Sequence, residues 1–167
     1  MSINLALDFS VNKENNTITI QKAFNAELPL VWRAFTNPEL LEKWWAPKPW
    51  KTKSKSMDFR PGGHWIYGMI GPEGEEHWAI ANYITIENEK RFTATDGFLD
   101  ADGNINKEMP QSKWDNNFSS IENGTLVIFY ITYNDLAQLE ATIQMGFKEG
   151  ITMTMNSLDE YLITLKK

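Results

Sequence analysis

Hydrophobic residues near the start of the chain first alternate with polar ones and then recur at helical spacing. Within residues 17–24, Ile18 and Ile20 are separated by polar neighbours, a period of two that predicts a half-buried strand. Two short helices are expected next. The first starts at about Pro29, since proline is favoured in the opening turn of a helix. The second follows Asn37, whose side chain can cap a helix N-terminus.

Turn-forming residues divide the middle of the chain into antiparallel strands. Turns at residues 61–63 and 71–74 bracket a strand over residues 64–70, in which alternate side chains share one face. Asn123 and Gly124 lie between two hydrophobic segments and give the strongest hairpin signal in the chain. The other expected strands cover residues 77–86, 91–97, 118–121 and 126–133, and residues 99–113 are expected to form a polar loop.

The last expected element is a long helix that starts near Phe147. Ile151, Leu158 and Leu162 recur on one face of it, and a shorter amphipathic helix precedes it over residues 136–145. An antiparallel sheet with one hydrophobic face must cover that face, and only this helix is long enough to do so. The expected fold is therefore α+β, of the helix-grip kind. A curved antiparallel sheet of about six to seven strands surrounds the C-terminal helix, and two short helices follow the first strand.

Length and composition predict a single domain without cross-links. The chain has 167 residues and no cysteine, so disulfide bonds, thiolate zinc sites and cysteine nucleophiles are excluded. Residues 1–16 are expected to form a polar lead, and residues 17–167 one domain. No apolar run is long enough for a membrane span and the start does not resemble a signal peptide, so a cytoplasmic location is expected.

The charge of the chain limits its partners. The net charge of −6 argues against a nucleic-acid partner, which usually requires a basic surface. Lys51, Lys53 and Lys55 nevertheless form a local basic cluster. Two interpretations stay open: a solvated face of a strand or loop, and a surface that docks an acidic partner.

Three segments carry a resemblance to a known family. They are Trp-Trp-Ala-Pro at residues 44–47, Met-Asp-Phe-Arg-Pro-Gly-Gly at 57–63 and Met-Gly-Phe-Lys-Glu-Gly at 145–150. In this order they resemble the single-domain relatives of the activator of heat-shock protein 90 ATPase, within the START-like helix-grip superfamily. The resemblance covers roughly residues 17–165. It implies a cavity between the sheet and the last helix, which members use to bind small apolar ligands, to cyclise polyketides or to dock a chaperone.

Few residues suggest chemistry. His64 and His77 lack the spacing of a metal site, and no phosphate-binding loop or nucleophile motif is present, so no metal or other cofactor is expected. His77, at the mouth of a cavity, is either a base or a hydrogen-bonded strand-end residue. Asp58 and Arg60 share one face of a strand, where they either form an internal ion pair or leave Arg60 to contact an anion.

The glycines of the last helix suggest a ligand site. Gly146 and Gly150 are expected on one helical face, where each costs roughly 1 kcal/mol relative to alanine. Close packing on the sheet or space for a ligand would explain them. The leading hypothesis is non-enzymatic binding of a small apolar molecule or lipid. The alternatives are a co-chaperone-like docking module of the stress response, which uses Lys51, Lys53 and Lys55, and a polyketide cyclase-type enzyme. The residues expected to line the cavity are Trp45, Trp65, Tyr67, Met69, His77, Phe92, Phe118, Phe147, Ile151 and Met155.

Overall fold

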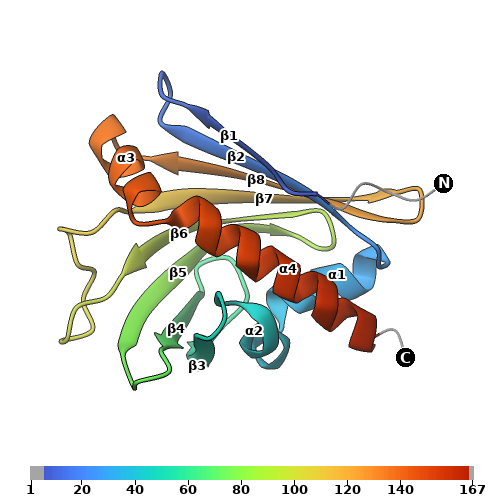
Figure 1. Cartoon of the computed structure of the whole chain (residues 1–167), viewed down its shortest axis with the longest axis horizontal. Coiled ribbons are helices and arrows are strands. Elements are labelled where there is room, and N and C mark those ends of the chain that lie inside the picture. Colours follow the sequence, from blue (N-terminus) through green and yellow to red (C-terminus); the bar gives the residue numbers. More distant parts are fainter. Residues whose placement is uncertain (1–5, 166–167) are drawn as a thin grey trace.

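Residues 6–165, which the computed structural model describes, form a curved antiparallel sheet with a long helix on its concave side (Figure 1). The strands are β1 (Asp8–Asn12), β2 (Thr17–Phe24), β3 (Lys51–Met57), β4 (His64–Ile70), β5 (Glu76–Glu87), β6 (Arg91–Phe98), β7 (Ser112–Ile121) and β8 (Gly124–Tyr133). The helices are α1 (Leu28–Thr36), α2 (Pro38–Trp44), α3 (Leu136–Gln144) and α4 (Phe147–Leu165).

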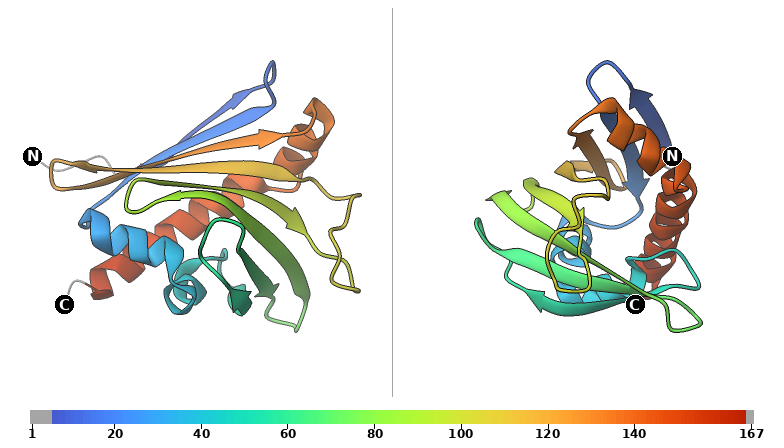
Figure 2. Two further views of the ribbon diagram at one scale, coloured as in Figure 1. Left: turned by 180° about the vertical axis from the view of Figure 1, so that it is seen from behind. Right: turned by 90° about the vertical axis from the view of Figure 1, so that its left-hand side faces the viewer.

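The sheet contains eight strands in the order β1-β2-β8-β7-β6-β5-β4-β3. The sheet bends around α4, and α1 and α2 lie on the same side of it as α4 (Figure 2). The predicted α+β helix-grip fold is therefore confirmed, with eight strands rather than six to seven. The side chain of Asn37 accepts hydrogen bonds from the backbone N–H groups of Glu39 and Leu40, so it caps α2 as expected.

An additional edge strand lies within the segment that was expected to be a polar lead. β1 pairs with β2 in antiparallel register, with Phe9 opposite Ile20 and Val11 opposite Ile18. The ring of Phe9 lies 6.2 Å from that of Phe147 in α4. The sheet thus begins at Asp8, and residues 1–5 lie outside the described part of the chain. The polar composition of β1 reflects its position at the edge, where most of its residues are exposed.

The junction between α3 and α4 differs from the expected geometry. Gly146 lies between the two helices with φ of +87°, a left-handed conformation that favours glycine. It therefore ends α3 and does not lie within the long helix as expected. Gly150 is inside α4, and a Cβ atom added there would meet only the Cγ atom of Pro47, at 3.9 Å. The cost of a glycine within the helix therefore applies to Gly150 alone.

A buried ion pair joins α4 to β2. Lys22 follows Ile18 and Ile20 on the inner face of β2, and only 2% of its side chain is exposed. Its Nζ atom lies 2.7 Å from a carboxylate oxygen of Asp159, whose side chain is 24% exposed. Burial raises the pKa of Asp159, and the hydrogen bond and charge of Lys22 oppose that rise. The pair therefore offsets the cost of burying a carboxylate between helix and sheet.

Candidate functional site

Two adjoining chambers lie between the concave face of the sheet and the helices. The larger one, called the outer chamber below, has a volume of about 300 Å³ and contacts α4 through Phe147, Gly150 and Ile151. The smaller one, the inner chamber, has a volume of about 60 Å³ and extends toward Phe92. The residues that line both chambers are Trp45, Tyr67, Asp96 and Trp114. The chambers therefore adjoin and share part of their walls.

Aromatic rings from separate elements form the wall between the chambers. Trp45, directly after α2, has its ring 6.5 Å from Tyr67 in β4 and 6.1 Å from Trp114 in β7. Trp65 and Tyr67 are stacked, with 4.0 Å between their ring centroids. They share a face because residues two apart on a strand point the same way. The fold thus assembles an aromatic surface from the residue after α2 and from β4 and β7.

Most of the residues predicted from the sequence line these chambers. Trp65 and Phe92 line the inner chamber, and Trp45 and Tyr67 line both. The remaining ones, Met69, Phe147 and Ile151, line the outer chamber.

Three predicted residues do not line either chamber. His77 lies opposite Met69 in the sheet but is exposed at the strand end, where its ring lies 5.4 Å from that of Trp50. Phe118 packs in the core, 5.0 Å from the ring of Trp32 in α1. Met155 is fully buried on the side of α4 that packs in the core. His77 is thus beyond the rim of the site, and the other two residues serve the core.

Asp96 is a charged residue of the chambers that was not among the residues predicted from the sequence. It follows Phe92 and Ala94 on the inner face of β6, and it lines both chambers. Within the described part of the chain, its Oδ1 atom is buried without a hydrogen-bond partner. Burial raises the pKa of this carboxyl to about 7, against the opposing effect of a hydrogen bond from the backbone of Gly97. The signal was present in the sequence, as an acidic residue at an inward position of a predicted strand.

The charge of Asp96 affects the pKa values of three tyrosines. Burial is the main cause that raises the pKa values of Tyr67, Tyr83 and Tyr133, and the negative charge of Asp96 raises them further. The pKa of Tyr133 reaches about 12, although a hydrogen bond with Thr142 opposes the rise. All three phenols are therefore uncharged near neutral pH.

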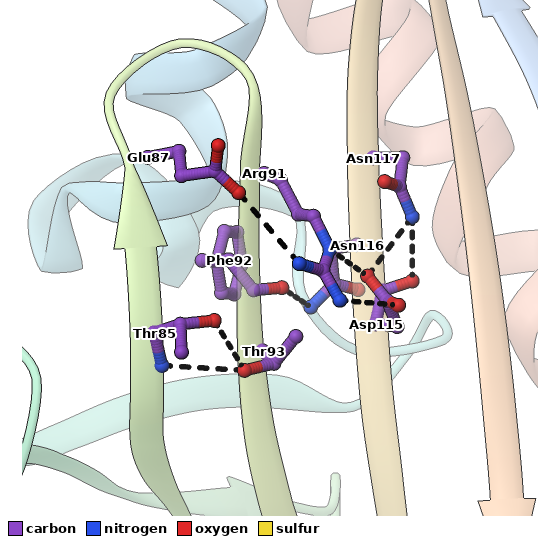
Figure 3. Close-up of polar contacts among 8 residues, drawn as sticks. All are labelled: Thr85, Glu87, Arg91, Phe92, Thr93, Asp115, Asn116 and Asn117. Atoms are coloured by element: carbon purple, nitrogen blue, oxygen red, sulfur yellow. Dashed lines mark hydrogen bonds and ion pairs between the residues drawn. The ribbon is translucent and has the colours of Figure 1, made fainter.

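A polar cluster joins β6 to β7 next to the inner chamber (Figure 3). The side-chain amide of Asn116, which lines this chamber, donates a hydrogen bond to the carbonyl of Phe92 at 3.3 Å. Arg91 donates two hydrogen bonds, of 2.8 and 2.9 Å, to the carboxylate of Asp115. The hydrogen bond from Arg91 is the main cause that lowers the pKa of Asp115. The guanidinium group of Arg91, the residue before Phe92, is thus paired with Asp115 and does not line the chambers.

The expected basic cluster is exposed but lies away from the chambers. Lys51, Lys53 and Lys55 follow one another along β3, the edge strand of the sheet, and all three are exposed. Lysines on an edge strand prevent pairing with other chains. The solvated face and the docking surface both remain compatible with this arrangement, so docking stays a prediction.

Asp58 and Arg60 contact each other beside the turn that follows β3. The Nε atom of Arg60 lies 2.6 Å from the Oδ2 atom of Asp58. The pair lies outside both chambers and has the geometry of the internal ion pair. Gly63 is required in this turn, because a Cβ atom there would collide with the carbonyl of Asp58.

Over residues 6–165, no group of three or more histidines, cysteines or carboxylates is arranged to hold a metal ion. Within the same residues, no helix has the length and apolar character that crossing a membrane requires.

Comparison with known proteins places this fold and cavity in a family. A family model described as activator of Hsp90 ATPase homolog 1-like protein matches residues 25–163. The chain belongs to this family. The resemblance expected from the sequence is therefore confirmed. A search of curated proteins finds no significant match.

Several solved structures resemble this member of the family over nearly its full length. A crystal structure of a protein from Mycobacterium smegmatis is 28% identical, with a TM-score of 0.87 and coverage of 95% of this chain and 98% of that one. A solution structure from Arthrobacter aurescens is 26% identical, with a TM-score of 0.89 and coverage of 94% and 91%. A crystal structure from Nitrosomonas europaea is 28% identical, with a TM-score of 0.79 and coverage of 91% and 97%.

Proposed function

We propose that this domain binds a small, mostly apolar molecule in the outer chamber without changing it chemically. The observation that carries the proposal is a chamber of about 300 Å³ with aromatic side chains from β4, β7, α4 and the residue after α2 in its walls. Sites for small molecules are concave and largely apolar, with volumes from about 300 Å³ upward and a few placed polar groups. Asp96, Tyr133 and Thr154 would be those polar groups here.

The position of Gly150 supports the same proposal. A glycine inside a helix costs about 1 kcal/mol relative to alanine. At Gly150 no neighbouring backbone requires the absence of a side chain, because an added Cβ atom would meet only Pro47, at an ordinary contact distance. Close packing on the sheet therefore does not account for this glycine. Its lack of a side chain keeps the wall of the outer chamber open.

The cyclase-type alternative has less support. It relied on His77 or a tyrosine as the reacting group, and His77 lies beyond the rim of the site. Tyr67 and Tyr133 do line the outer chamber, but their raised pKa values disfavour the ionised form that a base requires. We therefore favour a binding role for this domain over catalysis.

Filling the chamber from Gly150 should prevent binding. We expect Gly150→Leu to weaken the binding of octanol and of indole-3-ethanol by at least about tenfold, because its side chain would occupy the space of the ligand. Gly150→Ala should raise the free energy of unfolding by about 0.5–1 kcal/mol through helix propensity. Isothermal titration calorimetry measures the first effect, and urea denaturation measures the second.

Asn156→Leu is the matched control for this test. Asn156 is exposed on the same helix and lies outside both chambers, so a leucine there adds similar bulk without entering the site. Binding by the control should equal that of the native chain. If Gly150→Leu folds and binds both alcohols with native affinity, the outer chamber is not the binding site.

A further inference from the structure

Asp96 lies at the boundary between the outer and the inner chamber. Its carboxyl group lines both chambers, and its Oδ1 atom is buried and has no hydrogen-bond partner within the described part of the chain. Leaving a buried acceptor without a partner costs about 1–3 kcal/mol, and more for a charged group. A ligand that supplies the missing partner would recover this energy on binding.

No positive side chain is available to Asp96 within the site. Among residues 6–165, neither chamber has a lysine, arginine or histidine in its lining. Arg91, on the opposite face of β6, is paired with Asp115, and Lys22 is paired with Asp159. Lys113 lines a separate pocket together with Asp96, but its side chain is exposed. Within the two chambers, the complementary charge would therefore have to come from the ligand.

The surroundings of Asp96 favour a cation over a neutral hydrogen-bonding group. Trp45, Tyr67 and Trp114 line the same chambers, and aromatic rings attract organic cations. A neutral carbonyl group on a ligand gains nothing from ionised Asp96, because both groups only accept hydrogen bonds. The hydroxyl of Thr154, which also lines this chamber, already donates to the carbonyl of Gly150 at 2.9 Å. A protonated amine gains from both the carboxylate and the rings. The net charge of −6 also attracts cations to the protein.

We infer that the ligand of the outer chamber is an organic amine, whose protonated nitrogen pairs with Asp96 while its apolar body packs against Trp114 and Phe147. This inference rests on the proposed function, because it assigns a chemical class to the molecule bound in the same chamber. Charge-assisted hydrogen bonds of this kind contribute more than neutral ones and set the orientation of a ligand.

The test compares probes that share one apolar body and differ in charge. Octylamine, octanol and octanoate form one set, and tryptamine, indole-3-ethanol and indole-3-propionate form the other. Titration calorimetry at about pH 8, which is above the pKa of about 7 of the Asp96 carboxyl, should show each amine binding at least about tenfold more tightly than its alcohol. Each acid should bind most weakly. This comparison on the native chain requires no substitution.

Asp96→Asn then tests the assigned residue. In this variant we expect the ratio of amine affinity to alcohol affinity to fall to about one, because the amide cannot neutralise a cation. Asp102→Asn, in an exposed loop, is the matched control and should keep the native ratio. Thermal unfolding of both variants verifies that they are folded.

The possible outcomes separate the inference from the proposed function. If the alcohols bind but the native chain shows no preference for the amines, or if Asp96→Asn keeps that preference, the inference is overturned and the proposed function stands. If none of the probes binds below about 1 mM, both the inference and the proposed function are contradicted.

Discussion

Replacing Lys22 by methionine should lower the free energy of unfolding by about 3 kcal/mol. Methionine keeps much of the side-chain volume but removes the charge that lies 2.7 Å from Asp159. The carboxylate of Asp159, only 24% exposed, would then have to stay charged without Lys22 or take up a proton. Breaking a buried ion pair from one side is strongly destabilising for this reason. Urea denaturation at neutral pH measures the loss.

Two further variants identify the ion pair as the cause. The double variant Lys22→Met, Asp159→Leu removes both charges and should return to within about 1 kcal/mol of the native chain. Lys48→Met breaks the ion pair of Lys48 with Glu160 on the same helix, where both side chains are about 70% exposed. That loss should be below about 0.5 kcal/mol. If the double variant is as unstable as Lys22→Met alone, the ion pair does not explain the effect.

Replacing Asp96 by asparagine should stabilise the ligand-free protein above neutral pH. The pKa of this carboxyl rises from 3.8 to about 7 on folding. Each pKa unit corresponds to about 1.4 kcal/mol, so ionised Asp96 destabilises the fold by about 4 kcal/mol. The asparagine amide is also costly to bury, which reduces the expected gain at about pH 8 to about 2–3 kcal/mol.

The pH dependence gives this prediction a second readout. Between pH 3.8 and about 7, the folded chain keeps the Asp96 proton that the unfolded chain has released. The native state thus binds more protons, and raising the pH through this window lowers the free energy of unfolding. Tyr67, Tyr83 and Tyr133 stay neutral there, because their pKa values lie above the ordinary value of 10.0.

Denaturation curves across this pH range test the sign. Asp96→Asn should remove the Asp96 contribution to the decline in stability, whereas Asp102→Asn, in an exposed loop, should retain it. A loss of stability in Asp96→Asn at about pH 8, together with an unchanged pH profile, would contradict a destabilising carboxylate in the chambers.

Elements with a clear period were predictable from the sequence, and so were the faces they present. The strand over residues 64–70 was predicted with the observed bounds, and its alternation placed Trp65, Tyr67 and Met69 on one face. The long helix α4 and its buried Ile151 also followed from the residue spacing, although Gly146 was wrongly expected within this helix. These predictions succeed because a side chain on a strand or helix takes its direction from the backbone alone.

The edge strand β1 and the first half of β7 could not be recognised in this way. β1 exposes most of its residues, so it lacks the alternation of a half-buried strand. In β7, the three consecutive polar residues Asp115, Asn116 and Asn117 lack the alternation that marks a strand. Asn116 is nevertheless buried there, because its side-chain amide donates a hydrogen bond to the carbonyl of Phe92. Trp114, on this unpredicted part of the strand, was missed as a lining residue for the same reason.

The boundary between cavity and core required the three-dimensional packing. Phe118 and Met155 occupy inward positions of their elements, as the lining residues do, yet α1 and the sheet close over them. Trp32 of α1 covers Phe118, and no periodicity in the sequence indicates which inward residue another element will cover. The period of a strand or helix thus selects a face, while contacts between elements decide which part of that face stays open.

The most direct test of the ligand site uses the indole N–H signals of the tryptophans in a two-dimensional 1H–15N spectrum. Trp45 and Trp114 line the outer chamber, whereas Trp50 and Trp78 lie outside both chambers. During titration with octylamine, the account predicts that the Trp45 and Trp114 signals shift together and saturate, while those of Trp50 and Trp78 stay in place. Shifts confined to Trp50 and Trp78, or no shift of Trp45 and Trp114 up to about 1 mM of either octylamine or octanol, would contradict a ligand site between the sheet and α4.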